Sequence, residues 1–360
     1  MTVKPVLKKI LWGLAALLLL SALGAFFLLR ASLPKLDGEL ALPGLSQPTV
    51  IERDDNGTVT VRAQNAADSA RALGFVHAQE RYFEMDLLRR SASGELSELF
   101  GKIAIDKDKS IRVHRLRARI QQNYAQMAGS EAATLQAYAD GVNAGLDALS
   151  AKPWPYLLLN TAPEPWKPED SFLVGFAMFF DLQDEDNERE YKLWQLKNVL
   201  PAPIYAMLTQ TRSSWDAPLF GAPDVAVGIP DASQINLNAF DAPQLAYQPN
   251  RLAEAVGSNN FAVSGALTAD GRAIVADDMH LGLRAPNIWF RARLLTGADS
   301  DVSGFTLPGI PSVIVGSNRH VAWGFTNSYG DWADFMRVHW QDAGQTRYLD
   351  GDGKTRNVQV

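Results

Sequence analysis

The spacing of hydrophobic and polar positions changes character along the chain. From Ala66 to about Leu149, apolar residues recur every three or four positions, which predicts helices, with Asp68 as the expected cap of the first one. A segment with several prolines interrupts this pattern, and a further helical stretch is predicted over Glu169–Leu200. Residues 201–255 are rich in Pro, Ala, Asp, Asn and Gln and have little periodicity, so a surface segment or linker is expected there.

Short β-type runs make up the rest of the pattern. Thr49–Arg53 and Thr58–Arg62 flank an Asp-Asp-Asn-Gly turn and predict a hairpin, and a second hairpin is expected over Tyr348–Val360. Further runs, separated by turns, follow at 260–264, 273–276, 288–295, 312–316 and 320–324. Helices first and strands later predict a mixed α+β fold with a sheet that begins near Ser258.

The N-terminus carries an uncharged stretch from Ile10 to Leu29, preceded by three lysines and closed by Arg30. At about 1.5 Å per residue, this stretch spans roughly 30 Å, the thickness of a bilayer core. The preceding lysines favour a cytoplasmic N-terminus, which would place the rest in the periplasm or outside the cell. We therefore expect residues 1–30 to be a membrane anchor, followed by a linker over 31–46. A long signal peptide that is removed is the alternative.

Composition excludes several classes of protein. The chain has no cysteine, which rules out disulfides, thiolate metal sites and a cysteine nucleophile. Its formal net charge is −6, and after residue 40 no basic run is longer than a pair, so we expect no nucleic-acid partner.

The junction between the irregular segment and the first strand after it reads Gly257-Ser258-Asn259-Asn260. A serine hydroxyl needs a base to act as a nucleophile. When serine is the first residue of a chain, its own α-amine, with a reference pKa near 8, suits that task at neutral pH. Cutting the Gly257–Ser258 bond would create this amine, and the glycine leaves room for the hydroxyl to attack. Taken alone, the motif is more often a simple turn.

The residues around this junction resemble the penicillin acylase family, whose β-subunit begins with such a serine. Val256–Ser264 and the following Asp277–Leu283 are similar to the start of that β-subunit. Phe261 replaces the usual Trp, and Asp277 and Met279 replace the usual Asn and Pro. Four further blocks resemble the same family in order, at 70–101, 162–171, 287–294 and 308–326. The resemblance runs from about Thr49 to Val360, apart from residues 200–255.

The resemblance implies a four-layer αββα sandwich of the N-terminal-nucleophile hydrolases. It implies a precursor that cuts itself before Ser258 and again upstream. Residues 47–200 would then form a mainly helical α-subunit, 201–257 its tail and spacer, and 258–360 the start of the β-subunit. The product would be an αβ heterodimer that hydrolyses an N-acyl amide through an acyl-enzyme. Penicillin-type amides, acyl-homoserine lactones and related acylated amines are the candidate small-molecule substrates.

The resemblance also implies roles for individual residues. Ser258 would be the nucleophile, and the side chain or backbone of His280 would lie beside it, although a histidine that merely holds a loop fits equally. The backbone N–H of Asn327 would help to form the oxyanion hole, a donor of which is worth about 3 kcal/mol. Its side chain departs from the small or aliphatic residue expected there. The family's second oxyanion donor would fall beyond Val360, so we expect this chain to be the front part of a longer precursor.

A structural calcium site is expected by the same resemblance. Asp331, Ala333 and Asp334 match the family's calcium loop, and carboxylate and carbonyl oxygens are the ligands that Ca²⁺ takes. Glu190 is the expected ligand from the α-subunit, with Glu188 nearly as good. The alternative is a solvated acidic face. No organic cofactor is expected.

Other features have plainer interpretations. Phe176, Phe179 and Phe180 either line an acyl pocket or belong to the core. His77, on an apolar helical stretch, is expected to be a structural histidine with satisfied hydrogen bonds. Arg89-Arg90 are expected to make salt bridges on a helix surface or between chains. The Asp350-Gly-Asp-Gly-Lys run is interpreted as a hairpin turn rather than a calcium loop.

Two other functions compete with the amide hydrolase. The chain could be a non-catalytic, membrane-tethered binding protein with the same fold, an alternative that the retained Gly-Ser junction disfavours. It could also be a metal-dependent hydrolase that uses Asp277, Asp278 and His280. Adjacent strand residues point to opposite faces, however, which is a poor arrangement for chelation.

Overall fold

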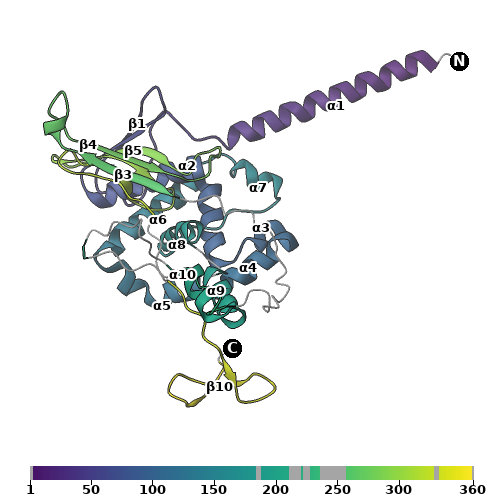
Figure 1. The fold of residues 1–360 in the computed structure, drawn as a ribbon. Coiled ribbons are helices and arrows are strands. Elements are labelled where there is room, and N and C mark those ends of the chain that lie inside the picture. Colours follow the sequence, from purple (N-terminus) through teal and green to yellow (C-terminus); the bar gives the residue numbers. More distant parts are fainter. Residues whose placement is uncertain are drawn as a thin grey trace. The chain divides into compact units, whose positions relative to one another are not determined.

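The computed structural model describes residues 3–183, 188–210, 220–221, 228–235, 257–327 and 332–358. The chain forms two compact units (Figure 1). The first comprises Met1–Leu182 and Val256–Asn327, and the second comprises Gln183–Ala255 and Ser328–Val360. Most of the predicted spacer, residues 201–257, lies outside the described residues.

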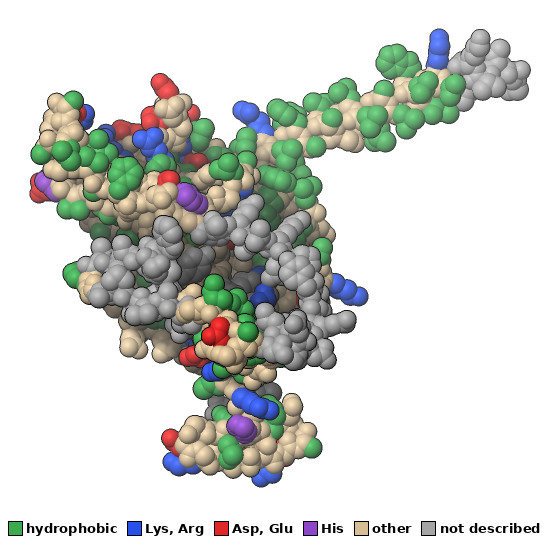
Figure 2. All heavy atoms as spheres, viewed as in Figure 1, with side chains coloured by type: hydrophobic (Ala, Val, Ile, Leu, Met, Phe, Trp, Pro, Cys, Tyr) green, Lys and Arg blue, Asp and Glu red, His purple; other side chains and the backbone are tan. Residues whose placement is uncertain are grey.

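The chain begins with the long helix α1, Val3–Ala31. Its hydrophobic side chains are exposed from Leu7 onward, and they line the helix on the face that the space-filling view shows (Figure 2). Leu7–Ala31 is long and apolar enough to cross a membrane, a property that a signal sequence near the N-terminus shares.

A six-stranded sheet forms one layer of the first unit. Its strands are, in spatial order, β1 (Val50–Arg53), β2 (Val59–Ala63), β5 (Phe290–Thr296), β6 (Ser300–Thr306), β7 (Val313–Ser317) and β8 (Ala322–Trp323). The predicted first hairpin is confirmed as the antiparallel β1–β2 pair. β2 then pairs in parallel with β5, so the sheet unites two segments more than two hundred residues apart. A strand does begin at Ser258, as predicted, but it belongs to a separate two-stranded sheet, and the larger sheet already includes β1 and β2. Strand β6 was not predicted at all.

Helices pack on this sheet and bury its apolar face. The central helix α2 (Ala66–Ser93) lies between strands β2 and β5 and the helices α6 (Ala132–Asp147) and α8 (Asp170–Leu182). Gly141 explains how α6 can approach so closely, because a Cβ there would lie 1.9 Å from the Arg71 carbonyl oxygen of α2. The remaining helices of this unit are α3 (Ser97–Phe100), α4 (Ile105–Arg112), α5 (Leu116–Ala128) and α7 (Trp154–Leu158).

The first turn of α2 corrects one expectation. The N-cap is Asn65, whose side chain accepts a hydrogen bond from the Asp68 backbone N–H at 2.9 Å. Asp68 lies inside the first turn, and its carboxylate accepts hydrogen bonds from the backbone and hydroxyl of Ser46 at 3.0 and 2.6 Å. These hydrogen bonds lower the pKa of Asp68 even though burial opposes them. A cap was correctly expected at this point, but the capping residue was wrong.

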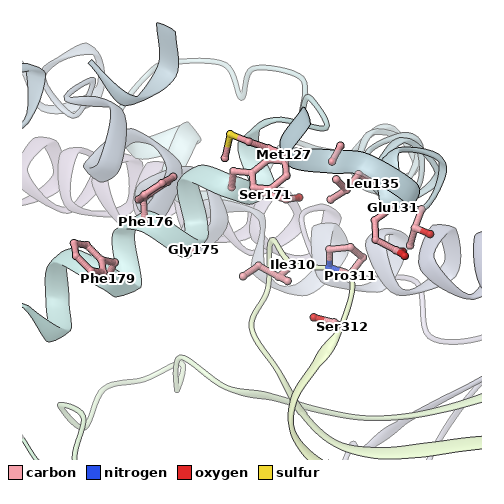
Figure 3. Close-up of a pocket in the computed structure, with 13 residues that line it drawn as sticks. Met127, Glu131, Leu135, Ser171, Gly175, Phe176, Phe179, Ile310, Pro311 and Ser312 are labelled. Atoms are coloured by element: carbon pink, nitrogen blue, oxygen red, sulfur yellow. The ribbon is translucent and has the colours of Figure 1, made fainter. Parts of the chain in front are cut away.

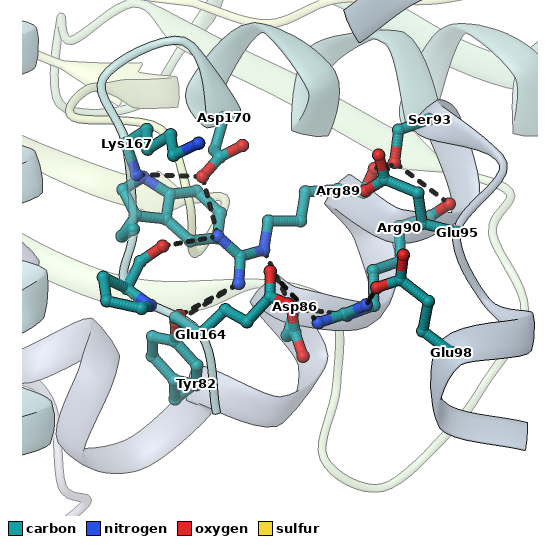
Figure 4. Close-up of polar contacts among 12 residues, drawn as sticks. Tyr82, Asp86, Arg89, Arg90, Ser93, Glu95, Glu98, Glu164, Lys167 and Asp170 are labelled. Carbon is teal, nitrogen blue, oxygen red and sulfur yellow. Dashed lines mark hydrogen bonds and ion pairs between the residues drawn. The ribbon is translucent and has the colours of Figure 1, made fainter. Parts of the chain in front are cut away.

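A buried ion-pair network joins α2 to the segment before α8 (Figure 4). Asp86 is fully buried and accepts from the Nε atoms of Arg89 at 2.7 Å and Arg90 at 3.0 Å, and from the Tyr156 hydroxyl at 2.5 Å. Arg89 also donates to Asp170 at 2.7 Å. The prediction that Arg89-Arg90 make surface or interchain salt bridges is wrong, because both side chains are buried within one unit.

Each charge in this network has several partners. Burial opposes a charged Arg89, but the neighbouring Tyr82, Asp170 and Asp86 hold the Arg89 pKa above its usual value. The Arg89 guanidinium also donates to two backbone carbonyls of residues 164–165, and it stacks 5.0 Å from the Trp166 ring centre. Arg89 thus joins two of the sequence blocks that resemble the acylase family, 70–101 and 162–171.

The described residues of the second unit form two helices and a small sheet. The predicted helical stretch Glu169–Leu200 is two helices, since α9 (Glu188–Val199) is separate from α8, and α10 (Ala202–Thr209) follows. The sheet has the order β11 (Thr355–Asn357), β10 (Arg347–Leu349) and β9 (His339–Trp340). The expected hairpin is confirmed, and the Asp350 carboxylate accepts from the backbone N–H groups of Asp352 and Lys354 in its turn.

Candidate active site

The predicted nucleophile begins a strand. β3 (Ser258–Val263) pairs antiparallel with β4 (Ile274–Met279), and Ser258 lies opposite Met279. Directly opposite residues of an antiparallel pair lie on the same face of the sheet, and consecutive residues alternate between faces. Ser258, Asn260 and Asp277 therefore share one face, whereas Asn259 and Asp278 share the other.

The Ser258 hydroxyl lies beside the peptide bond whose cleavage the sequence predicts. Its Oγ donates a hydrogen bond to the Gly257 carbonyl oxygen at 2.7 Å. The same oxygen accepts the backbone N–H of His280 at 3.2 Å. The His280 N–H polarises this carbonyl and would stabilise negative charge on its oxygen when the hydroxyl attacks.

His280 contacts the Gly257 carbonyl through its backbone. Its ring lies on the face away from Ser258, where Nε2 is 3.3 Å from Asp278 Oδ2 and 3.2 Å from Asn259 Nδ2. On that face Nδ1 also lies beside Gly257, 3.4 Å from where a Cβ on that residue would be. The Asn259 side chain in turn donates to Asp278 at 3.1 Å, and the Asn259 hydrogen bond is the main reason why the Asp278 pKa is lowered. This exposed trio braces the two strands against each other.

The arrangement disfavours a catalytic metal on this hairpin. Asp277 and Asp278 point to opposite faces, as strand alternation predicts. Across the described ranges, no three or more His, Asp or Glu side chains are grouped so that they could hold a metal ion.

The segment Gly324–Asn327 passes over the face that carries Ser258. A Cβ on Gly324 would lie 2.8 Å from the Asp277 side chain and 2.9 Å from Asn260 Nδ2, so only glycine allows this close approach. At the end of the segment, Asn327 Nδ2 donates to the Leu182 carbonyl at 2.9 Å and so caps the C-terminus of α8. The unexpected asparagine side chain thus has a structural partner, and it fixes the segment whose backbone is predicted to serve the oxyanion.

An apolar pocket lies between the helices and the loop before β7 (Figure 3). It has a volume of about 530 Å³ and is lined by α8 side chains, including Phe172, Phe176 and Phe179. Ile310 and Pro311 form the opposite wall. Two of the three predicted pocket aromatics therefore line a cavity, whereas Phe180 packs on His114 with ring centres 4.9 Å apart.

A buried hydrogen-bond relay fixes the loop that forms this wall. The Gly309 N–H donates to the Tyr138 hydroxyl at 2.8 Å, and that hydroxyl lies 2.8 Å from His77 Nδ1. His77 Nε2 lies 3.0 Å from the Thr306 hydroxyl, which itself donates to the Phe290 carbonyl at 2.9 Å. Because the Thr306 hydroxyl donates its hydrogen to that carbonyl, it can only accept from His77. Nε2 is therefore the protonated ring nitrogen, and Nδ1 accepts from the Tyr138 hydroxyl. Burial lowers the pKa of His77 to about 3, so the expectation of a satisfied structural histidine is confirmed.

Comparison with known proteins shows the family to which the chain belongs. The sequence profile of the penicillin amidase family matches residues 48–360. The chain belongs to the penicillin amidase family. It is 32% identical over 333 residues to penicillin acylase 2 proenzyme from Pseudomonas sp. (strain SE83), which covers 88% of this chain and 41% of that protein.

Two further proteins are similar to this member of the penicillin amidase family. The chain is 29% identical over 324 residues to the acyl-homoserine lactone acylase QuiP of Pseudomonas aeruginosa, covering 90% of this chain and 38% of that protein. A solved structure of a thermostable penicillin G acylase from Alcaligenes faecalis covers 49% of this chain and 99% of that one, at 23% identity and a TM-score of 0.42. The chain spans about two fifths of the length of the curated relatives that it matches.

The predicted calcium ligands are described only in part. Asp331 lies outside the described residues, while Ala333 and Asp334 are exposed and Glu190 is half-buried. Neighbouring residues bring the two segments together: the Tyr191 and Phe335 ring centres are 5.5 Å apart. Trp332 Nε1 donates to Gln183 Oε1 at 3.1 Å. The start of α9 and the 332–335 segment are therefore side by side.

Proposed function

We propose that the full-length protein is a self-processing hydrolase of N-acyl amides, with Ser258 as its nucleophile. The observation that carries this proposal is the Ser258 hydroxyl, which lies 2.7 Å from the Gly257 carbonyl oxygen while the His280 N–H holds the same oxygen. Membership of the penicillin amidase family supports the reaction class, and so do the names of the relatives, which are acylases.

Processing would start with attack of Ser258 Oγ on the Gly257 carbonyl carbon. The hydroxyl proton is transferred to the Ser258 nitrogen, the Gly257–Ser258 C–N bond breaks, and an ester joins Gly257 to Oγ. Water then hydrolyses this ester, which frees the Gly257 carboxylate and restores the serine hydroxyl. The new chain begins at Ser258 with an α-amine, and two subunits result from one precursor.

Turnover would repeat the same chemistry on an external amide. The α-amine accepts the hydroxyl proton as Oγ attacks the acyl carbonyl, and it delivers a proton to the departing amine. Water then releases the acyl group as an acid. Backbone N–H groups, with Asn327 as the expected contributor from this chain, would stabilise the oxyanion by about 3 kcal/mol for each donor.

The substrate would carry an apolar acyl group. We assign this group to the cavity beside Phe176 and Phe179, whose size is typical of small-molecule sites of roughly 300–1,000 Å³. Penicillin-type amides and acyl-homoserine lactones are the candidate classes, since relatives named for both match this chain.

The remaining expectations belong to the same proposal. The complete enzyme would have the four-layer αββα sandwich and would be held at the membrane by α1, with its catalytic part in the periplasm or outside the cell. Glu190, Asp331, Ala333 and Asp334 would hold a calcium ion, because each offers a carboxylate or carbonyl oxygen of the kind that Ca²⁺ takes. The ion would brace the α9 segment against residues 331–335.

Release of amines from a panel of N-acyl amides tests the proposed activity. The full-length protein and its Ser258→Ala variant are incubated with phenylacetyl, hexanoyl and dodecanoyl amides, and the released amine is quantified by chromatography. The proposal expects turnover by the parent protein and none by the variant. Binding of these amides without turnover by the parent would instead favour the non-catalytic, membrane-tethered binding protein.

A further inference from the structure

Asp277 is a buried carboxylate for which the described residues supply no donor. Both of its oxygens are buried, and neither has a hydrogen-bond partner among those residues. It lies in β4 directly opposite Asn260 and therefore on the same face as Ser258. Its sequence neighbour Asp278, on the other face, is exposed and accepts hydrogen bonds from Asn259 at 2.7 and 3.1 Å. The two adjacent aspartates thus have opposite environments.

The surroundings of Asp277 contain no counter-charge within the described chain. Strand β3 (SNNFAV) carries no ionisable side chain, and neither does the segment Gly324–Asn327 that covers this face. Asp278 and His280, which also lie near Ser258, belong to the opposite face. A buried carboxylate without a donor or a cation is unfavourable, so this site suits a positive group that the described part of the uncut chain does not supply.

Cleavage at Ser258 would create such a group on the correct face. The new α-amine is attached to the residue two pairs along the ladder from Asp277, because Ser258 lies opposite Met279 and Asp277 is two residues before Met279. Diagonal neighbours of this kind have Cα atoms about 7–8 Å apart. The aspartate side chain and the amine can shorten that gap to the roughly 4–6 Å over which opposite charges favour the charged form.

We propose that the Asp277 carboxylate is the charge partner of the Ser258 α-ammonium in the processed enzyme. It is a positioning residue that orients the amine and keeps it protonated to higher pH than a neutral residue would. This inference rests on the proposed self-processing at Ser258. Its consequence is a working pH range displaced upward relative to relatives that have asparagine at this position, which is the usual residue in the resemblance described above.

The experiment compares the parent protein with Asp277→Asn, all as full-length, processed enzyme. A short pulse of formaldehyde with cyanoborohydride methylates only unprotonated amines, and the mass of the Ser258 peptide reports the extent of reaction at each pH. A synthetic Ser-Asn-Asn-Phe peptide in the same tube corrects for the reagent. We expect the midpoint for the Ser258 amine to fall by about one pH unit in Asp277→Asn, because an opposite charge within 4–6 Å is lost.

Asp278→Asn is the matched control, since it removes the same charge from the adjacent residue on the exposed face. Its midpoint should stay at the parent value. Asp277→Ser, measured in parallel, should show the same shift as Asp277→Asn. Circular dichroism of both variants shows whether either has a folding defect. Where an acyl substrate is found, the acid limb of kcat/KM should move by the same amount.

The outcomes separate this inference from the proposed function. If the parent protein yields no Ser258 N-terminus, the proposed function fails. If the parent is processed but Asp277→Asn and the parent share one midpoint, only the inference fails. An equal shift in Asp278→Asn would also overturn it, because a general change in charge would then explain the result. A folded Asp277→Asn protein that stays uncut contradicts it too, since the carboxylate is proposed to act after cleavage.

Discussion

The helical core and the β3–β4 hairpin differ in how many hydrogen-bond partners their buried charged side chains have. In the core, Asp86 is fully buried and has three donors, and Arg89 satisfies two carboxylates and two carbonyls. In the hairpin, the described residues supply no donor to the buried oxygens of Asp277, and the Ser258 hydroxyl donates to the backbone carbonyl of Gly257.

This difference separates residues that stabilise the fold from residues that carry chemistry. Fully partnered buried charges fix the arrangement of helices, and their loss leaves an uncompensated charge. An unpartnered charge beside a nucleophile lowers stability and is expected where a reaction supplies the missing partner. Substitutions in the two regions should therefore change different observables.

Substitution of Ser258 should have the largest effect. Ser258→Ala in the full-length protein should leave a single uncut polypeptide without activity, because no hydroxyl remains to attack Gly257. Ser258→Cys retains a nucleophile and is expected to cleave but to hydrolyse substrates slowly. Gel electrophoresis and intact mass report the first effect, and amine release reports the second. Normal cleavage of Ser258→Ala would refute the assignment.

The buried ion-pair network should dominate stability. Asp86→Asn leaves Arg89 and Arg90 without their shared carboxylate and should lower the free energy of unfolding by about 3–5 kcal/mol. Urea denaturation followed by circular dichroism measures this loss. Arg62→Ala is the control, because the Arg62–Glu52 pair is half exposed and should contribute no more than about 1 kcal/mol. Equal losses in both variants would contradict the contrast.

Tyr138→Phe tests the relay behind the pocket wall. The change leaves the buried Gly309 N–H and His77 Nδ1 without their partner, which should cost on the order of 1–3 kcal/mol. Because the loop beside Ile310 is released, KM for a long acyl chain should rise more than kcat falls. Tyr124→Phe, at the edge of α5, should leave both quantities near the parent values. A loss of stability with an unchanged KM would contradict the view that the relay shapes the pocket.

His77 should make stability depend on pH. Burial lowers its folded-state pKa to about 3 from the ordinary 6.5, so below pH 6.5 the unfolded chain takes up a proton that the folded chain refuses. Stability should therefore fall as the pH drops from 6.5 towards 3 and be insensitive to His77 above 6.5. Between pH 7 and 5, the parent should lose about 2 kcal/mol more than His77→Gln. Parallel urea titrations at both pH values measure the difference, and identical losses would remove His77 as the cause.

Local patterns in the sequence predicted the local structure well. The β1–β2 and β10–β11 hairpins have turn residues that specify them, and α2 has a strong helical period. Ser258 and His280 were singled out by the Gly-Ser junction and by the resemblance to the acylase family, and the structure places them in or beside one hairpin.

Features that depend on distant partners were beyond that reasoning. Strand β6 (SDVSGFT) lacks the apolar alternation of a typical strand and is specified by its neighbours β5 and β7. The parallel β2–β5 pair joins segments separated by the whole helical layer. The burial of Arg89 depends on residues 164–170, which no local pattern links to it. The local sequence around Arg89 is typical of an exposed helix face.

The most direct test of the central claim is intact mass combined with N-terminal sequencing of the purified full-length protein. The account predicts two chains, one of which begins Ser-Asn-Asn-Phe at Ser258. A single, folded, uncut chain would contradict self-processing and would favour the membrane-tethered binding protein.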